Sequence, residues 1–129
     1  MNCDYKSVED LLSCHPLFVD CSQLDDTLVR VHTNMKYFGG SDIDVFIGAQ
    51  EEDCDIRRVS DLSSSFCILF GFLEGDTYSP ERQRFVSDIA RTLGLQENAG
   101  EVYVDATRSE LWAALTKVAK ASQRMSYMK

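Results

Sequence analysis

Six carboxylates crowd a short stretch of the chain, and acidic side chains at this density are the first candidates for chemistry. They are Asp42, Asp44, Glu51, Glu52, Asp53 and Asp55. Paired carboxylates serve as general acid and base, and their oxygens also bind divalent cations. A patch of one charge can equally attract a basic protein or simply form a hydrated surface. The sequence therefore leaves four interpretations, and the spacing of the acids decides how much support each has.

The spacing does not fit a known metal centre or catalytic pair. Asp42-x-Asp44 begins like a calcium loop, but Phe46 stands where the next ligand is required, and no Gly or closing Glu follows at the required offsets. A helix–sheet nuclease would need a lysine on the following strand, where the chain has Arg57 and Arg58. We expect no metal, no cofactor and no enzymatic activity, although a carboxylate site of unfamiliar spacing stays open as a third class of function.

The other reactive residue types add no catalytic motif. His15 precedes Pro16, and His32 lies on the polar side of an expected strand, so we expect both to be surface or capping residues. The cysteines are odd in number and lack C-x-x-C spacing, which favours free thiols over disulfides or zinc knuckles. There are five of them, Cys3, Cys14, Cys21, Cys54 and Cys67. The chain also lacks G-x-S-x-G, P-loop and H-E-x-x-H motifs.

The net charge of −8 is unevenly distributed along the chain. Residues 1–80 contain 15 acidic and 5 basic side chains, whereas residues 81–129 contain 6 and 8. Because phosphate contacts need a basic stripe, this pattern argues against direct binding of nucleic acid. It favours a protein partner with a basic surface, including a nucleic-acid-handling complex whose phosphate site the carboxylates could occupy.

Three short strands are expected to position the acidic residues. Alternation of Val29 and Val31 with Arg30 and His32 predicts a strand over 28–33. The same alternation predicts a strand over 42–47, and 55–59 is a third, with 48–53 as a polar loop. Short connections between them imply an antiparallel meander. On this hairpin the six carboxylates would lie near one end and one face of the sheet.

Helices should complete the domain. Capping and apolar spacing predict helices over 7–15, 80–93 and from about Ser109, and 102–104 is expected to be a fourth short strand. The almost entirely apolar segment 60–73 is either a central core helix or partly a buried strand. The helix over 80–93 has Ser79 and Pro80 at its start and buries Phe85, Val86, Ile89, Ala90 and Leu93. The last buries Leu111, Trp112, Leu115, Val118 and Ala119. We predict one α+β domain over 1–129, with a short antiparallel sheet packed against three to four helices.

The location follows from what the chain lacks. No apolar run approaches the ~20 residues that span a bilayer, so we expect no membrane contact. The start, Met1–Tyr5, has no basic and then apolar segment of a secretory signal. We therefore expect a cytoplasmic protein, in the host cell if it is encoded by a phage.

Four motifs between about residues 26 and 105 carry a family resemblance. They are Leu28–Thr33, Gly39-Gly40, Ile43–Ile47 and the Ser60-Asp61 step after Arg58-Val59. In this order they resemble an uncharacterised domain family of bacteria, phages and prophages, with a strand meander followed by helices. The resemblance implies a mobile-element context in which small acidic proteins often disable host defence. The family has no established active site, so it assigns no residue a role.

Two functional hypotheses follow from the sequence. The first is an inhibitor, similar in action to anti-CRISPR proteins, that binds a nucleic-acid-handling host complex through the six carboxylates. The second is a regulatory or structural module that forms a homodimer through apolar surface, using Phe46, Phe70 or Phe72. Salt distinguishes them, because it screens charge–charge attraction but does not weaken apolar association.

Overall fold

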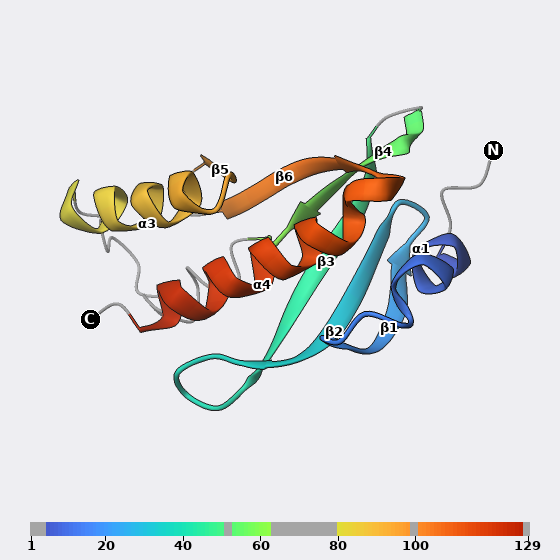
Figure 1. The fold of residues 1–129 in the computed structure, drawn as a ribbon, viewed down its shortest axis with the longest axis horizontal. Helices are drawn as coiled ribbons and strands as arrows, with labels where there is room; N and C mark the ends of the chain where they lie inside the picture. Colours follow the sequence, from blue (N-terminus) through green and yellow to red (C-terminus); the bar gives the residue numbers. More distant parts are fainter. Residues whose placement is uncertain (1–4, 51–52, 63–79, 99–100, 128–129) are drawn as a thin grey trace.

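Six antiparallel strands form one sheet in the computed structural model, which describes residues 5–50, 53–62, 80–98 and 101–127. The order across the sheet is β1-β2-β3-β4-β6-β5, so β1 and β5 are its two edges (Figure 1). The strands are β1 (Phe18–Asp25), β2 (Leu28–Lys36), β3 (Asp42–Gln50), β4 (Asp53–Ser60), β5 (Gln96–Asn98) and β6 (Glu101–Thr107).

The described helices lie on one side of this sheet. They are α1 (Tyr5–Leu12), α3 (Pro80–Thr92) and α4 (Leu111–Ser126), the last preceded by a 3-10 turn, η1 (Arg108–Glu110). Figure 1 shows α4 running across the sheet, where it contacts β2, β3, β4 and β6. Helix α1 packs beside β1, α3 packs beside β5, and both contact α4. The opposite face therefore has no helix from the described part of the chain.

The core lies between α4 and the inward-facing side chains of the central strands. Alternate residues of β2 and β3 are buried, among them Val31, Val45 and Ile47. They meet the buried stripe of α4, which comprises Leu111, Ala114, Leu115, Val118, Ala119, Ala121, Ser122 and Met125. Burying each large aliphatic side chain contributes roughly 1.5–3 kcal/mol. Because of this core, one face of the sheet is packed against helices, and no helix of the described residues covers the other face.

The α+β class and the antiparallel β2–β3–β4 meander are confirmed, but the sheet is larger than the three to four strands predicted. Strand β3 runs to Gln50, so the expected loop beginning at Gly48 is wrong up to that point. Strand β1, Phe18–Asp25, lies before the three predicted strands of the meander, and β5 was not predicted because its three residues, Gln96–Asn98, are polar. Pairing with a neighbouring strand overrides weak local preference in these segments.

The helix predictions were accurate in position and less so in burial. Helix α3 begins at Pro80 as predicted, but Phe85 is 40% exposed. Trp112 is 46% exposed, so the prediction that α4 buries it is wrong. The apolar segment 60–73 lies mostly outside the described residues, and Ser60 is the last residue of β4.

None of the helices that the structure describes has the length and apolar character needed to cross a membrane.

Candidate functional site

The predicted acidic residues lie at opposite ends of β3. Asp42 opens this strand, whereas Gln50 at its other end pairs with Asp53, the first residue of β4. At ~3.4 Å per residue the two ends are roughly 27 Å apart. The expectation that all six carboxylates gather at one end of the sheet is therefore wrong. Glu51 and Glu52 lie outside the described residues, and Asp55 follows Asp53 on β4.

His32 and Lys36 bind the first pair of predicted acids. The His32 Nε2 atom lies 2.8 Å from Asp42 Oδ2, and its Nδ1 atom lies 3.0 Å from Asp44 Oδ1. Lys36 also forms an ion pair with Asp42. The register explains these contacts, because His32 is directly opposite Asp44 and Lys36 is opposite Asp42 across a bulge.

This cross-strand cluster reduces the negative charge at the start of β3. Carboxylates only accept hydrogen bonds, so both contacts of His32 are satisfied when both ring nitrogens carry protons. Asp42 and Asp44 thus contact His32 and the cationic Lys36 on β2, and His32 adds positive charge only in its doubly protonated form. His32 is a surface residue as expected, and it is hydrogen-bonded to both Asp42 and Asp44.

The helix-free face of the sheet contains a second self-paired group. Arg58 Nε donates to Asp105 Oδ1 at 2.9 Å, and its Nη2 donates to Oδ2 at 3.3 Å. The Arg58 guanidinium also stacks 4.2 Å from the centroid of the Tyr103 ring. The hydrogen bond with Asp105 raises the pKa of Arg58 above its ordinary value. The charges of Arg58 on β4 and Asp105 on β6 are thus also matched within the sheet.

Acidic residues at the β1 edge differ from those on β3. Asp20, Asp25 and Asp26 are exposed and have no cationic partner among the residues the structure describes. Strand β1 pairs with β2 on one side only, within the described part of the sheet. Val19 and Leu24 are also exposed on this strand. This edge, which has no neighbouring strand among the described residues, therefore combines exposed apolar side chains with charge that no described cation offsets.

Asp25 keeps its charge because of the turn that follows it. Its Oδ1 atom accepts hydrogen bonds from the backbone N–H of Thr27 at 2.8 Å and from the Thr27 hydroxyl at 3.0 Å. These bonds, the backbone one first, hold the pKa of the Asp25 carboxyl below its ordinary value. The carboxylate is thus stabilised by neutral donors, which leave its negative charge uncompensated.

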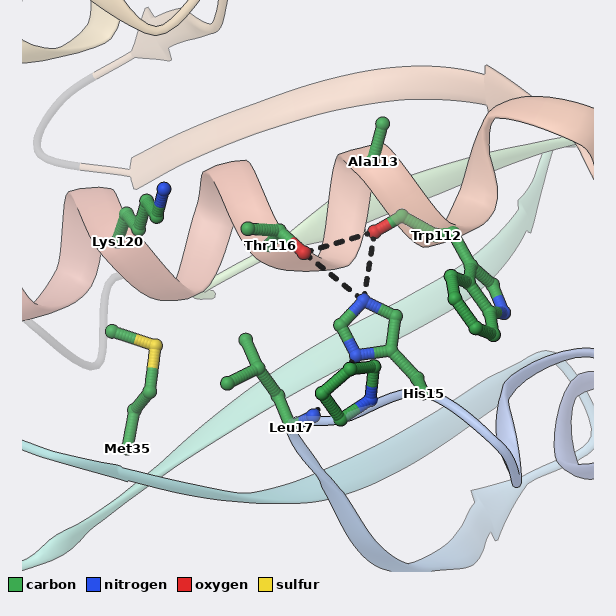
Figure 2. A pocket seen from close by; sticks show the side chains of 8 residues that line it. His15, Leu17, Met35, Trp112, Ala113, Thr116 and Lys120 are labelled. Atoms are coloured by element: carbon green, nitrogen blue, oxygen red, sulfur yellow. Dashed lines mark hydrogen bonds between the residues drawn. The ribbon is translucent and has the colours of Figure 1, made fainter.

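His15 fixes the chain between α1 and β1 against α4 (Figure 2). This residue is only 6% exposed, so its expected place on the surface is wrong. Its Nδ1 atom accepts from the Leu17 backbone N–H at 3.0 Å, so the ring proton is on Nε2. Nε2 lies 3.0 Å from both the Trp112 carbonyl oxygen and Thr116 Oγ1. Both ring nitrogens are therefore engaged, which leaves the imidazole no free role as a base.

Trp112 completes the same contact between distant parts of the chain. Its indole N–H donates to the Leu11 carbonyl oxygen at 2.8 Å, near the end of α1. Its ring lies edge-on to His15, with 4.9 Å between ring centroids. Carbonyls in the last turn of a helix lack intrahelical partners, so this bond satisfies one of them. Together, Trp112 and His15 join α1, the following turn and α4.

A groove of about 510 Å³ opens beside these residues. Its lining is mostly apolar, with one exposed lysine, and comprises His15, Pro16, Leu17, Met35, Trp112, Ala113, Thr116 and Lys120. Sequence reasoning missed this groove, although Trp112, Thr116 and Lys120 follow one another at intervals of four. That interval places residues on one face of a helix.

Neither the groove nor the acidic residues that the structure describes form a metal centre. No group of three or more His, Cys, Asp or Glu side chains could hold a metal ion within residues 5–50, 53–62, 80–98 and 101–127. Cys14 and Cys21 are free thiols, as expected for the two cysteines whose state the structure gives. The arrangement is suited to binding by charge, by apolar contact and by backbone pairing.

No protein family, curated protein or solved structure matches this chain.

Proposed function

We propose that the protein acts by binding a protein partner with a basic surface, and that the β1 edge is the binding element. The observation that carries this proposal is the lack of cationic partners, among the described residues, for Asp20 and Asp25 on the edge strand β1 and for Asp26 in the turn after it. An extended segment that adds to β1 as a new strand gains main-chain hydrogen bonds. Lysine or arginine side chains on that segment would meet the aspartates.

The charge of β1 favours a basic partner over a second copy of this chain. Like charges placed opposite each other across two strands are destabilising. Register shifts after Phe18 and after Gln23 interrupt the edge, and such bulges discourage uncontrolled pairing. Exposed Val19 and Leu24 add apolar contact area for either partner. A β1–β1 homodimer is therefore the less favoured alternative.

The homodimer predicted through phenylalanines has weaker support. Phe46 is half-buried on the helix-free face of the sheet. Phe70 and Phe72 lie outside the described residues. Of the three phenylalanines predicted to form the dimer, only Phe46 therefore lies in the described part of the chain.

A role in inhibition follows from the kind of partner. Proteins that handle nucleic acid present basic surfaces to phosphates, and carboxylates can occupy such surfaces. The resemblance to a phage and prophage domain family supports the same setting. We therefore propose a small non-enzymatic inhibitor of a nucleic-acid-handling host complex, of which a CRISPR effector is an example. Asp42 and Asp44 contribute less to this binding than the sequence suggested, because His32 and Lys36 offset their charge.

The test compares two charge-reversal variants of equal charge change. Asp20→Lys with Asp26→Lys alters the β1 edge, whereas Glu81→Lys with Asp88→Lys alters exposed positions on α3 at the other end of the sheet. Each variant, with the unmodified protein, is used to capture partners from bacterial lysates and to challenge DNA cleavage by purified CRISPR effectors. We expect the β1 variant alone to lose the captured basic proteins and any inhibition.

Two results would contradict the proposal. Equal retention of the same proteins by all three forms would show that β1 is not the binding element. Light scattering over a salt series separately tests self-association. A dimer that persists at 1 M NaCl and is lost on replacing Val19 and Leu24 by threonine would instead support the homodimer.

A further inference from the structure

The groove beside α4 has the size and lining of a small-molecule site. Its volume of about 510 Å³ falls within the roughly 300–1,000 Å³ typical of ligand pockets. Pro16, Leu17, Met35 and the exposed Trp112 indole provide apolar contact along its length. Figure 2 shows Leu17, Met35 and the Trp112 ring on the side of α4 where His15 lies.

One polar side chain in the lining of the groove has no hydrogen-bond partner within the described residues. Both His15 nitrogens are engaged, and Thr116 Oγ1 bonds with His15 and with the Trp112 carbonyl oxygen at 3.2 Å. Lys120 is exposed and has no hydrogen bond or ion pair within the described residues. Its ammonium carries three donors and a full positive charge. A ligand that fills the groove therefore needs an acceptor, and an anionic one is best.

The wall of the groove is held in place before any ligand arrives. The bonds from His15 to α4 and from Trp112 to the Leu11 carbonyl oxygen tie the turn to the helix. Asn34 on β2 fixes the same turn from below, because its side-chain amide donates to the Pro16 carbonyl oxygen at 2.8 Å. A preformed site loses less conformational entropy on binding, so more of the contact energy appears as affinity.

We infer that this groove binds an amphipathic monocarboxylate, such as a medium-chain fatty acid or an apolar aromatic acid. The apolar part lies along Leu17, Met35 and Trp112, and the carboxylate pairs with Lys120. A single negative charge is favoured over a phosphate ester because the chain already has a net charge of −8, which disfavours multiply charged anions. This site is separate from the β1 edge and does not depend on the proposed inhibitory function.

Trp112 reports on binding directly because it is the only tryptophan in the chain. The intact protein is titrated with sodium decanoate below its micelle-forming concentration while tryptophan fluorescence is recorded. We expect a saturable blue shift as the exposed indole is covered. Decyltrimethylammonium and decanol are matched probes with the same chain and a positive or neutral head, and both should bind more weakly.

Variants on α4 separate charge from shape. Lys120→Gln should weaken decanoate binding about twofold to fivefold, the range for one exposed ion pair. The matched control Lys117→Gln, an exposed lysine outside the groove lining, should leave it unchanged. Ala113→Gln places a longer neutral side chain on the wall and should remove most binding. The β1 variant Asp20→Lys with Asp26→Lys should bind decanoate normally, which keeps the two proposals independent.

Four results would overturn the inference. The first is the absence of a saturable fluorescence change with decanoate. The second is equal weakening of decanoate binding by Lys120→Gln and Lys117→Gln, and the third is binding of decyltrimethylammonium as tight as that of decanoate. The fourth is loss of a captured protein partner on Ala113→Gln while no probe binds, which would assign the groove to a protein interface.

Discussion

Aspartates on β1 and on β3 are the same residue type in the same kind of element, yet their surroundings differ. Asp42 and Asp44 on β3 contact His32 and Lys36. Asp20 and Asp26 on or beside β1 contact no cation among the described residues. The number of acidic residues in a sequence therefore does not give the charge at the protein surface, because cross-strand neighbours can offset the charge of a carboxylate.

The contacts of His32 explain the difference. Strands β1 and β3 are both neighbours of β2, and His32 is opposite Asp20 on one side and opposite Asp44 on the other. Directly opposite side chains on neighbouring strands lie about 5 Å apart, close enough to pair. Both ring nitrogens of His32 are bonded to Asp42 and Asp44, however, so Asp20 receives no hydrogen bond from His32.

The largest expected effect is on binding of an extended basic peptide. We expect Asp20→Lys with Asp26→Lys to weaken binding of an eight-residue peptide of alternating Lys and Val by about tenfold or more, because two attractions become repulsions. Asp42→Asn with Asp44→Asn should change it less than about twofold. Calorimetric titration measures both affinities, and amide shifts locate the peptide on β1. Equal losses in the two variants would remove the distinction between the strands.

The second effect is on stability, and its order is reversed. Asp42→Asn with Asp44→Asn should lower the free energy of unfolding by about 1 kcal/mol, since the affected ion pairs are partly exposed and each contributes at most that order. Asp20→Asn with Asp26→Asn should stay within about 0.5 kcal/mol or stabilise the fold by reducing repulsion. Urea unfolding measures both. The β3 loss should shrink at 1 M NaCl, and a loss insensitive to salt would contradict an electrostatic origin.

A smaller effect concerns the acid dependence of stability. The pKa of Asp25 is lowered in the folded state, so its carboxylate contributes to the free energy of unfolding above the unfolded pKa of about 3.9. This contribution is lost as the pH falls through the pKa of the folded state. Asp25→Asn should therefore flatten the loss of stability below about pH 4. Thr27→Val keeps the backbone donor and removes the hydroxyl, so it should retain part of the dependence. Urea midpoints between about pH 2.5 and 6 measure it, and unchanged profiles in both variants would contradict this role for Thr27.

The smallest effect tests the predicted acids between β3 and β4. Glu51→Lys with Glu52→Lys should reduce partner binding less than the β1 reversal if the edge strand is the main contact. The same peptide titration measures it. A larger loss than that of Asp20→Lys with Asp26→Lys would return the binding site to the position that the sequence indicated.

Local patterns were enough to predict the class of fold. Alternation in β2 and β3 and the helical spacing after Pro80 indicate periods that only strands and helices have, and both predictions match the structure. The burial of Trp112 was mispredicted because an indole at the margin of an apolar stripe can instead direct its N–H to a carbonyl, here that of Leu11. Strand β5 gave no signal, because three polar residues acquire strand geometry only from pairing with β6.

The sequence by itself determined an acidic α+β chain with an antiparallel meander, because composition and side-chain period are local properties. Which acids have a partner became visible only in the fold, because the register of β2 and β3 brings His32 within hydrogen-bond distance of Asp42 and Asp44. The fold alone also brought His15 and Trp112 together from positions nearly a hundred residues apart to wall a groove. Contacts of this kind depend on which strands and helices become neighbours, and that information is spread over the whole chain.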